Sequence, residues 1–347
     1  MPRVKNISLH NLAKYLGLSK TTVSRGLAGY PEVSIDTQRR IKDAALLLNY
    51  APNNHATRLS KGTSKTIGQI IPMSDHIVLN PIFADFIAGA SEVYAEHDFD
   101  LLFSAVKNNK ELQSYKDLAN SGKVDGFVVS EPKINDQRFS LLEDLGVPYV
   151  VHGRSNQKND EVEFHWVDVD NQEAFYNATK YLLKFGFRKI AFLNGHKEMN
   201  FAIERQIGFE RALEEHKITL KNEWIHFREM SEQEGYKLTT SILESEKWPE
   251  AILCSSYLMA LGALRALQEK RLAVGLDLSI ICWDDCLSFL KQTNGDPYFT
   301  CIQSSIFDAG RHVAQMMMDI IQRPHEKFQK KLIKTKFVVG KTTPYLG

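Results

Sequence analysis

The residues from Lys20 to Arg25 combine positive charge and hydroxyl groups at a spacing suited to contacts with DNA. Arg25 can form two hydrogen bonds to a guanine, and Lys20 can approach a guanine or a phosphate. Thr21 and Thr22 can bond to bases or phosphates. A helix over this stretch would present these groups together. The candidate DNA-binding residues of this helix are Lys20, Thr21, Thr22 and Arg25.

The elements that must position these side chains are two short helices joined by a glycine turn. Ser8 and Ser19 can each cap the start of a helix. Between the helices, Gly17 allows the positive φ of a tight turn. Small Ala13 permits a close helix crossing, and Val23 fills the gap. This layout predicts a helix-turn-helix whose second helix enters the major groove, with an ordinary helical hairpin as the alternative.

A third helix is expected after Ser34, and residues 53–61 follow it after the break at Pro52. The buried stripe of the third helix would comprise Ile41, Ala44, Ala45 and Leu48. Residues 53–61 are too short and too polar to form a stable helix alone. They are either a plain linker or a hinge that becomes helical only on DNA, with Leu59 inserted into the minor groove.

Charge is distributed unevenly along the chain. The 347 residues carry 43 Lys+Arg and 42 Asp+Glu, for a net charge of +1. Residues 1–62 hold ten basic and three acidic residues, so this part carries +7 and the remainder carries −6. A small basic module on a larger, mildly acidic body indicates an electrostatic partner for the N-terminal part alone. With the helix-turn-helix pattern, this favours DNA binding over a solvated basic surface.

From residue 66 onward, short apolar runs alternate with amphipathic stretches. The expected strands are Ile67–Ile71, Leu101–Ala105, Gly126–Val129, Tyr149–Val151, Ile190–Leu193, Ile252–Cys254, Ser279–Cys282 and Thr300–Gln303. The expected helices include Phe83–His97, Phe175–Phe185, Ile207–His216 and Leu258–Glu269. Alternating strands and helices predict α/β architecture, and this many strands favours two doubly wound parallel sheets with a cleft between them. The predicted fold is therefore an all-α head followed by a two-lobed α/β core.

Composition and motifs argue against several other classes of protein. With 43% apolar and 24% charged residues, the chain has an ordinary globular composition. We find no apolar window long enough to span a membrane and no secretory signal, so we expect a cytoplasmic protein without a membrane partner. The four cysteines do not make a disulfide scaffold.

The sequence contains no recognisable enzymatic motif. GxGxxG, the P-loop, GxSxG and HExxH are all missing, so we expect neither an enzyme nor a cofactor. Cys282 and Cys286 lie four residues apart, but no second pair of metal ligands lies near them in the sequence. We interpret them as buried structural thiols and expect no metal site.

The segment LAKYLGLSKTTVSRGLAGYPEVS resembles the N-terminal head of the lactose-repressor (LacI/GalR) family of transcription regulators. NYAPNNHATRLSKGTSKTIGQIIP is similar to the hinge and first core strand of that family. The resemblance continues through VDGFVVS, FGFRKIAFLNG, RQIGFERAL, ALGALRAL and WDD, so it covers essentially the whole chain. It implies a core like that of periplasmic binding proteins, a homodimer or dimer of dimers on a pseudo-palindromic operator, and a small effector in the interlobe cleft. Because no heptad tail follows Tyr345, we expect a dimer rather than a coiled-coil tetramer.

We expect a head with its hinge at 1–62 and a core at 63–347. Lobe 1 would comprise about 66–165 and 296–325, and lobe 2 about 166–295 and 326–347. By position in the motifs, the resemblance implies that Lys20, Thr21 and Arg25 read bases. It also implies that Asn53 and Ala56 make hinge contacts and that Leu59 is the minor-groove wedge.

The resemblance places effector contacts on Phe83, Arg205 and Asp284. An aromatic ring can stack on a sugar or a base, and an Arg opposite an Asp suits adjacent hydroxyls of a polyol. From the residues alone, we would prefer to interpret Arg205 as a helix-surface cation and Asp284 as a strand-end cap. Two departures change the expected pocket: Ser256–Tyr257 stand where many members have an amide and a carboxylate, and Asp75–Leu79 lengthen a loop.

The combination of VVHGRS, NFAIERQIGF and AILCSS with the longer loop is similar to regulators of α-glucoside uptake and hydrolysis. This similarity also places Ser130 and Arg154 near the pocket. The first candidate effector is therefore an α-glucoside such as maltose, trehalose or sucrose. We expect a repressor of carbohydrate uptake and utilisation genes that is released from its operator when this sugar binds in the interlobe cleft. Three alternatives stay open: a solute-binding protein, a sugar-cleaving enzyme without an identifiable carboxylate pair, and a regulator with a purine-like corepressor or with activating function.

Overall fold

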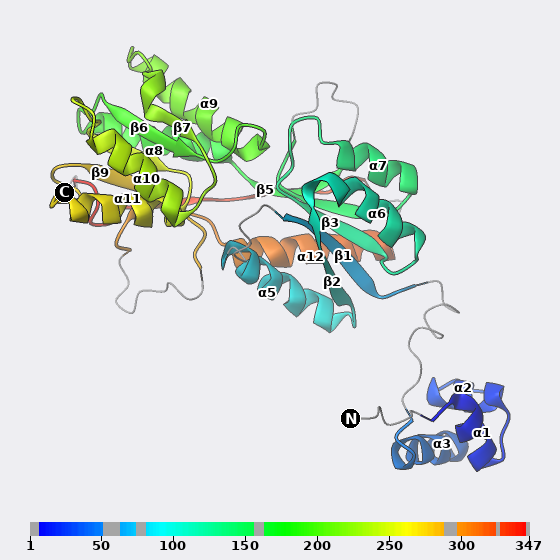
Figure 1. Cartoon of the computed structure of the whole chain (residues 1–347). Helices are drawn as coiled ribbons and strands as arrows, with labels where there is room; N and C mark the ends of the chain where they lie inside the picture. The colour runs from blue at the N-terminus through cyan, green and yellow to red at the C-terminus, as the bar shows by residue number, and fades with distance from the viewer. Residues whose placement is uncertain are drawn as a thin grey trace. The chain divides into compact units, whose positions relative to one another are not determined.

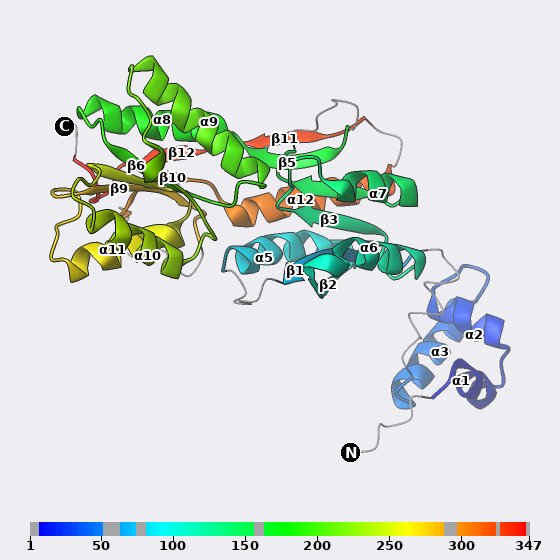
Figure 2. The ribbon, with the colours of Figure 1, turned by 45° about the horizontal axis from the view of Figure 1, so that its top comes forward.

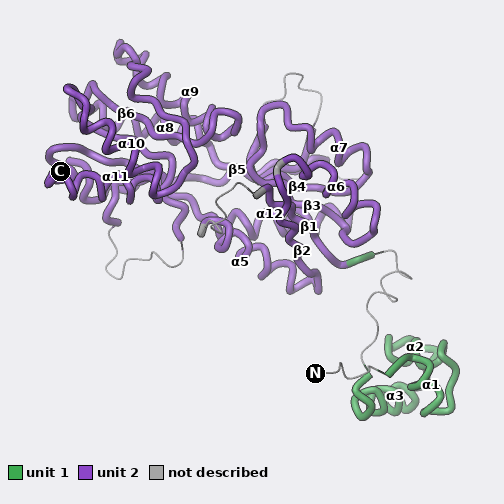
Figure 3. The backbone as a smooth tube through the Cα atoms, viewed as in Figure 1, with its two compact units in different colours: residues 1–64 green, residues 65–347 purple. Residues whose placement is uncertain are grey.

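The computed structural model describes residues 7–50, 63–73, 81–155, 163–287, 297–323 and 327–344. The chain divides into two compact units, Met1–Ser64 and Lys65–Gly347 (Figure 3). The expected hinge residues Asn53, Ala56 and Leu59, and the loop Asp75–Leu79, lie outside the described residues.

The first unit is a bundle of three short helices, α1 (Leu9–Leu16), α2 (Lys20–Leu27) and α3 (Ile35–Leu47) (Figure 1). The side chains of Ser8, Ser19 and Ser34 each accept a hydrogen bond from the backbone N–H three residues further on. Gly17 has φ 64° and ends α1. The small core comprises Leu12, Ala13, Val23, Val33, Ile41, Ala44 and Ala45. The predicted helix-turn-helix is confirmed, with the predicted caps and turn.

The second unit contains two six-stranded sheets, one in each lobe. Sheet 1 has the order β11-β5-β4-β3-β1-β2 and is parallel throughout. Its strands are β1 (Thr66–Met73), β2 (Asp100–Lys107), β3 (Gly126–Ser130), β4 (Tyr149–His152), β5 (His165–Val169) and β11 (Lys330–Ile333). Sheet 2 has the order β12-β10-β9-β8-β6-β7, with only β12 antiparallel to its neighbour. Its strands are β6 (Ile190–Asn194), β7 (Ile225–Phe227), β8 (Ala251–Cys254), β9 (Ser279–Asp284), β10 (Thr300–Gln303) and β12 (Lys336–Val338).

Helices cover both faces of each sheet, as Figure 2 shows. On sheet 1, α5 (Pro81–Glu96) and α12 (Ile306–Gln322) pack on one face, and α6 (Glu111–Asn120) and α7 (Gln137–Leu145) on the other. On sheet 2, α8 (Asn171–Lys184) and α9 (Asn200–Glu215) oppose α10 (Glu232–Leu243) and α11 (Tyr257–Glu269). The short helices η1 (Asn108–Lys110) and η2 (Asn222–Trp224) complete the core. The predicted fold class, a helical head with two doubly wound lobes, is confirmed.

Paired helices approach each other closely through glycine. A Cβ added to Gly89 in α5 would lie 2.0 Å from the carbonyl oxygen of Phe307 at the start of α12. A Cβ on Gly310 in α12 would lie 2.1 Å from the oxygen of Phe86. In the other lobe, a Cβ on Gly262 in α11 would lie 2.0 Å from the oxygen of Glu232. These contacts bring helix backbones together with no room for a side chain.

The chain passes between the lobes three times, from β5 to α8, from β10 to α12 and from β11 to β12. The lobe boundaries that we expected therefore differ from the sheets at three places. β5 and β11 belong to sheet 1 rather than to lobe 2, and β10 belongs to sheet 2 rather than to lobe 1. β5 and β11 are short and carry polar residues such as His165 and Lys330, so apolar patterning did not reveal them. Among the described residues, no helix has the length and apolar character needed to cross a membrane.

Candidate functional sites

The candidate DNA-binding residues lie on α2. Lys20, Thr21 and Arg25 are exposed, and the four-residue spacing of Thr21 and Arg25 places them on one face of the helix. Thr22 is different, because it is half-buried and its Oγ1 lies 2.8 Å from Oγ of the cap residue Ser19. Its hydroxyl thus takes part in the helix start.

Sequence reasoning missed one further candidate on the head. Tyr15 in α1 is 59% exposed, although its neighbours Leu12 and Ala13 are buried. Its phenol faces solvent and can hydrogen-bond to a phosphate. The helical period of α1 placed this residue on the polar face, so its aromatic type was the available indication.

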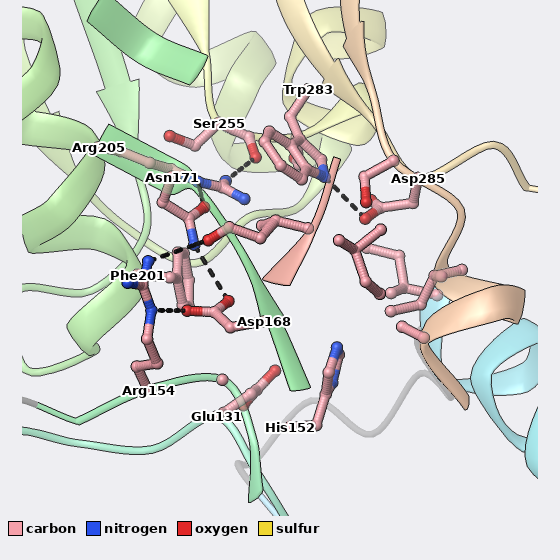
Figure 4. Close-up of a pocket in the computed structure, with 18 of the residues that line it drawn as sticks. Glu131, His152, Arg154, Asp168, Asn171, Phe201, Arg205, Ser255, Trp283 and Asp285 are labelled. Carbon is pink, nitrogen blue, oxygen red and sulfur yellow. Dashed lines mark hydrogen bonds and ion pairs between the residues drawn. The ribbon is translucent and has the colours of Figure 1, made fainter. Parts of the chain in front are cut away.

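The second candidate site is a cleft between the lobes, at the carboxyl ends of strands from both sheets (Figure 4). Crevices beyond the carboxyl ends of parallel strands are the usual ligand sites of open α/β sheets. The polar and charged residues that line the cleft include Glu131, His152, Arg154, Asp168, Asn171, Arg205, Ser255, Ser256, Asp285 and Ser304. Its apolar walls include Ile82, Pro132, Phe201, Met230, Trp283 and Ile306.

A chain of hydrogen bonds runs across the cleft from one lobe to the other. Arg154 donates from Nε to Asp168 Oδ2 at 2.8 Å, and Asn171 donates from Nδ2 to Asp168 Oδ1 at 3.3 Å. Arg205 donates from Nε to Asn171 Oδ1 at 2.8 Å and from Nη1 to the carbonyl oxygen of Ser255 at 2.6 Å. Arg154 and Asp168 belong to lobe 1. Asn171 begins α8 and Arg205 lies in α9, and both helices belong to lobe 2. The network therefore fixes both arginines at the lobe boundary.

Arg205 is buried among aromatic rings. Its Cζ lies 4.2 Å from the centroid of Trp283, 4.9 Å from Phe201 and 5.0 Å from Phe175. Burial lowers its pKa to about 10, against the opposing effects of Asp285 and Asp168. Arg205 therefore stays charged near neutral pH, and the ring faces stabilise that charge.

Two further titratable groups face the cleft. Asp285 is 9% exposed and accepts a hydrogen bond from Trp283 Nε1 at 2.8 Å. Burial raises the pKa of Asp285 to about 6, although the Trp283 bond and Arg205 act in the opposite direction. His152 stacks on Phe86 with the ring centroids 4.8 Å apart, and burial lowers its pKa to about 4. The imidazole is therefore neutral near pH 7.

The structure brings three of the expected effector residues to the cleft, namely Arg154, Arg205 and Ser256. Ser256 is 1% exposed, and its Oγ caps α11 by accepting from the Met259 N–H at 3.1 Å. This hydroxyl therefore has a structural partner already.

The other four expected residues are not among those lining the cleft. The ring of Phe83 packs edge-on against Phe103, with the centroids 5.5 Å apart. Ser130 Oγ accepts from Gln69 Nε2 at 3.0 Å. These two side chains of lobe 1 make contacts within their own lobe.

Tyr257 and Asp284 likewise make contacts within lobe 2. The ring of Tyr257 lies edge-on to Phe299, with the centroids 5.2 Å apart. Asp284 accepts from the Cys286 N–H at 2.9 Å and from Gln303 Nε2 at 3.1 Å. This geometry matches the strand-end cap that the residues alone had left as the alternative. The next residue, Asp285, lines the cleft in its place.

Several residues that line the cleft were not predicted from the sequence. They are His152, Asp168, Asn171, Phe201, Trp283 and Asp285. Polar residues at the carboxyl end of a parallel strand were the available indication for Asp168, inside β5, and for Asn171, which begins the next helix. Because β5 itself was not predicted, that indication was not visible.

Comparison with known families covers both units. Residues 8–53 match the family model of bacterial regulatory proteins of the lacI family. Residues 64–341 match the model of periplasmic binding proteins and the sugar binding domain of the LacI family. The chain belongs to the LacI family. The resemblance inferred from the sequence is confirmed, and this LacI-family protein is a DNA-binding transcriptional regulator.

Curated relatives resemble this LacI-family regulator over nearly their full length. The HTH-type transcriptional regulator AglR of Rhizobium meliloti (strain 1021) is 36% identical over 337 residues, which cover 97% of this chain and 94% of AglR. The HTH-type transcriptional repressor PurR of Glaesserella parasuis serovar 5 (strain SH0165) is 30% identical over 323 residues, covering 92% of each chain. Both relatives are named as transcription regulators.

Solved structures show the same fold. The lac repressor dimer bound to operator and the anti-inducer ONPF has a TM-score of 0.82 and 22% identity, covering 98% of this LacI-family regulator and 100% of that chain. The complex of the transcriptional regulator CelR with cellobiose has a TM-score of 0.71 and 23% identity, covering 97% and 100%.

Proposed function

We propose that this LacI-family regulator represses carbohydrate uptake and utilisation genes and is released from its operator by a neutral sugar in the interlobe cleft. An α-glucoside such as maltose, trehalose or sucrose is the first candidate. The family model that covers residues 64–341 includes sugar binding domains, and the CelR neighbour holds cellobiose. No catalytic role is proposed for the cleft.

The charge state of the cleft carries this proposal. The carboxyl groups of Glu131, Asp168 and Asp285 outnumber the guanidinium groups of Arg154 and Arg205. Both arginines already donate hydrogen bonds to protein oxygens, at 2.6–3.1 Å. A phosphate or carboxylate ligand would therefore meet carboxylates without a cation reserved for it. A neutral polyol avoids this cost, because its hydroxyls can donate to Asp285 and accept from the remaining N–H groups of Arg205.

The aromatic rings of the cleft favour a sugar over a flat base. Arg205 lies over both Trp283 and Phe201, so these rings hold the guanidinium. A purine would have to compete with Arg205 for these ring faces, whereas sugar hydroxyls can bond to its edge. For this reason we place the purine-like corepressor second.

On the DNA side, we propose that Lys20, Thr21 and Arg25 read base edges and that the chain acts in the cytoplasm as a homodimer on a pseudo-palindromic operator. The lac repressor neighbour is a dimer bound to its operator. Asn53, Ala56 and Leu59 remain our candidates for hinge contacts. Effector closure of the cleft would shift lobe 1, where the chain enters the core at Lys65. Such coupling requires a ligand with different affinity for the two states and is typically about 1–3 kcal/mol.

A gel-shift experiment tests the proposal. The DNA upstream of the protein's own gene is incubated with the full chain at low salt, alone or with maltose, trehalose, sucrose, trehalose 6-phosphate or adenine. We expect a shift that a neutral α-glucoside abolishes and that trehalose 6-phosphate leaves intact. Absence of any shift would contradict operator binding. Stronger binding with adenine would favour the corepressor, and release by trehalose 6-phosphate alone would contradict the charge argument.

A further inference from the structure

An isolated backbone pairing joins the two lobes beside the cleft. Lys133 and Met199 form an antiparallel bridge outside any sheet. The N–H of Ile134 donates to the oxygen of Glu198 at 3.2 Å, and the N–H of Asn200 donates to the oxygen of Pro132 at 3.1 Å. One segment follows β3 of sheet 1 and the other follows β6 of sheet 2. The pairing is thus a contact between lobes.

This bridge is separate from the three crossovers of the chain. The crossovers follow β5, β10 and β11, whereas the bridge uses the loops after β3 and β6. The bridge can therefore break without unpairing any strand of either sheet. Its two hydrogen bonds exist only while the lobes are close together.

The lobe 1 side of the bridge is built rigidly. Asp136 Oδ2 accepts from the Lys133 N–H at 3.0 Å and from Arg138 Nη2 at 2.6 Å. The same Arg138 nitrogen donates to the oxygen of Glu131 at 3.1 Å. Ser155 Oγ donates to the oxygen of Lys133 at 2.6 Å. These bonds fix the segment on both sides of Pro132.

The lobe 2 side leads directly to the cleft. Asn200 is the first residue of α9, and the same helix carries Phe201 and Arg205 in the cleft wall. Pro132, on the opposite strand of the bridge, also lines the cleft. The bridge therefore ties the start of the helix that holds Arg205 to lobe 1.

We propose that this pairing is a closure latch. It forms as the lobes close, holds the first turn of α9 against lobe 1 and adds to the stability of the closed cleft in the free protein. A ligand that enters the cleft requires the latch to open and is retained when it forms again. The latch itself depends only on the geometry of the core; its influence on operator release rests on the proposed function.

Cross-linking tests the latch directly. Because its hydrogen bonds flank the Lys133–Met199 pair, this pair is of the non-hydrogen-bonded type, with Cα atoms about 4.5 Å apart. That separation lies within the range of about 4.4–6.8 Å that disulfides span. Lys133 is exposed and Met199 is half-buried, so K133C and M199C preserve the core.

In the full chain without sugar, we expect the K133C/M199C double variant to cross-link under mild oxidation. A matched control, K133C/K197C, moves one thiol two residues away into the turn and should cross-link at least tenfold more slowly. We expect small-angle scattering to give the oxidised K133C/M199C chain a smaller radius of gyration than its reduced form in matched buffer. Equal cross-linking rates for the two pairs, or no change in radius of gyration, would overturn the latch.

A second pair of variants removes one hydrogen bond. Ile134→Pro lacks the donor N–H, whereas Ile134→Ala keeps it and removes a side chain that is already 38% exposed. With maltose as the probe, we expect calorimetry to show about fivefold weaker binding for I134P than for I134A, the usual net effect of one hydrogen bond. Equal affinities and equal radii of gyration for the two variants would contradict the latch. If maltose binds neither to the two variants nor to wild type, the proposed effector is wrong. The radii of gyration of I134P and I134A still test the latch in that case.

Discussion

At the scale of residues, two adjacent carboxylates have different roles. Asp284 ends β9 and accepts hydrogen bonds from Cys286 and Gln303, whereas Asp285 bonds to Trp283 and faces the cleft. Successive side chains of a strand point to opposite sides, so a shift of one residue decides which acid meets a ligand. The family motif directed our expectation to Asp284, and the geometry of the strand end favours Asp285.

Asp285→Asn should increase stability at neutral pH while it weakens sugar binding. Burial raises the pKa of Asp285 to about 6 in the folded chain, against about 3.9 for an unfolded Asp. As pH rises between these values, the unfolded chain releases its proton first, so the folded state loses stability. Asn cannot ionise and should therefore be more stable than wild type at pH 7 by roughly 1–3 kcal/mol, with the difference disappearing near pH 4. Urea unfolding across this pH range measures the effect.

Asp284→Asn is the matched control for that experiment. It alters the acceptor of the Cys286 N–H and Gln303 bonds, which do not line the cleft. We expect lower stability at both pH values and retained sugar binding. If Asp284→Asn abolished binding and Asp285→Asn did not, our assignment of the cleft carboxylate would be wrong.

At the scale of elements, glycine contacts set how closely paired helices pack. Gly262 in α11 approaches the backbone of α10, and Gly89 and Gly310 do the same between α5 and α12. Since the nearest atoms at these glycines are backbone atoms of the packed helices, an added methyl group must push the helices apart.

Gly262→Ala should lower the free energy of unfolding by at least about 2 kcal/mol, despite the better helix propensity of alanine. The new Cβ would lie 2.0 Å from the oxygen of Glu232. Gln268→Ala, at an exposed position of the same helix, is the control and should change stability little. Denaturant unfolding of both variants checks this. Equal losses in the free energy of unfolding would contradict the claim that the close approach of α10 and α11 excludes a side chain at position 262.

The elements also show what the sequence alone could predict. Apolar central strands such as β3 and β8 were predicted because both of their faces are buried. Each therefore has a continuous apolar run in its own sequence. Short polar strands such as β5 and β11 are stabilised by pairing with each other, about 165 residues apart in sequence, which local patterning cannot reveal. The head was predicted in more detail, since its caps and its Gly17 turn are local features.

The candidate site was predicted only where a motif and the fold agreed. Arg205 was expected from the motif, and α9 places it in the cleft. Asp168 and Asn171 were missed, because their role comes from a hydrogen-bond chain that joins two lobes. Phe83 was expected as a stacking residue, yet the turn of α5 packs it on Phe103.

At the scale of the whole molecule, two separate units should give separable activities. Arg25 is exposed on α2 and does not belong to the hydrophobic core of the head, so the Arg25→Ala variant should fold normally. We expect it to lose about 1–3 kcal/mol of operator discrimination and to keep sugar affinity. Asp285→Asn should bind operator but resist release by sugar. Gel shifts and calorimetry on both variants test this, and loss of the same activity in both would refute a two-site protein.

The charge division between the units predicts opposite salt responses. Since residues 1–62 carry +7 and the remainder −6, only operator binding should depend strongly on salt. Between 50 and 200 mM KCl, we expect operator affinity to fall by at least about 100-fold, and maltose affinity to change less than about twofold. Lys20→Ala removes one positive charge from α2 and should make the salt dependence of operator binding less steep. Equal salt slopes for operator and maltose would contradict the assignment of DNA binding to the head.

The last strands of the chain have a consequence for synthesis. β11 completes sheet 1 and β12 completes sheet 2, although most of sheet 1 precedes residue 170. Neither lobe can finish folding on the ribosome until the C-terminal segment has emerged. Until then, each sheet of the nascent core lacks one strand and has an unpaired edge. Long-range pairing of this kind slows folding and exposes strand edges to aggregation. The small head, whose contacts are all local, can fold long before.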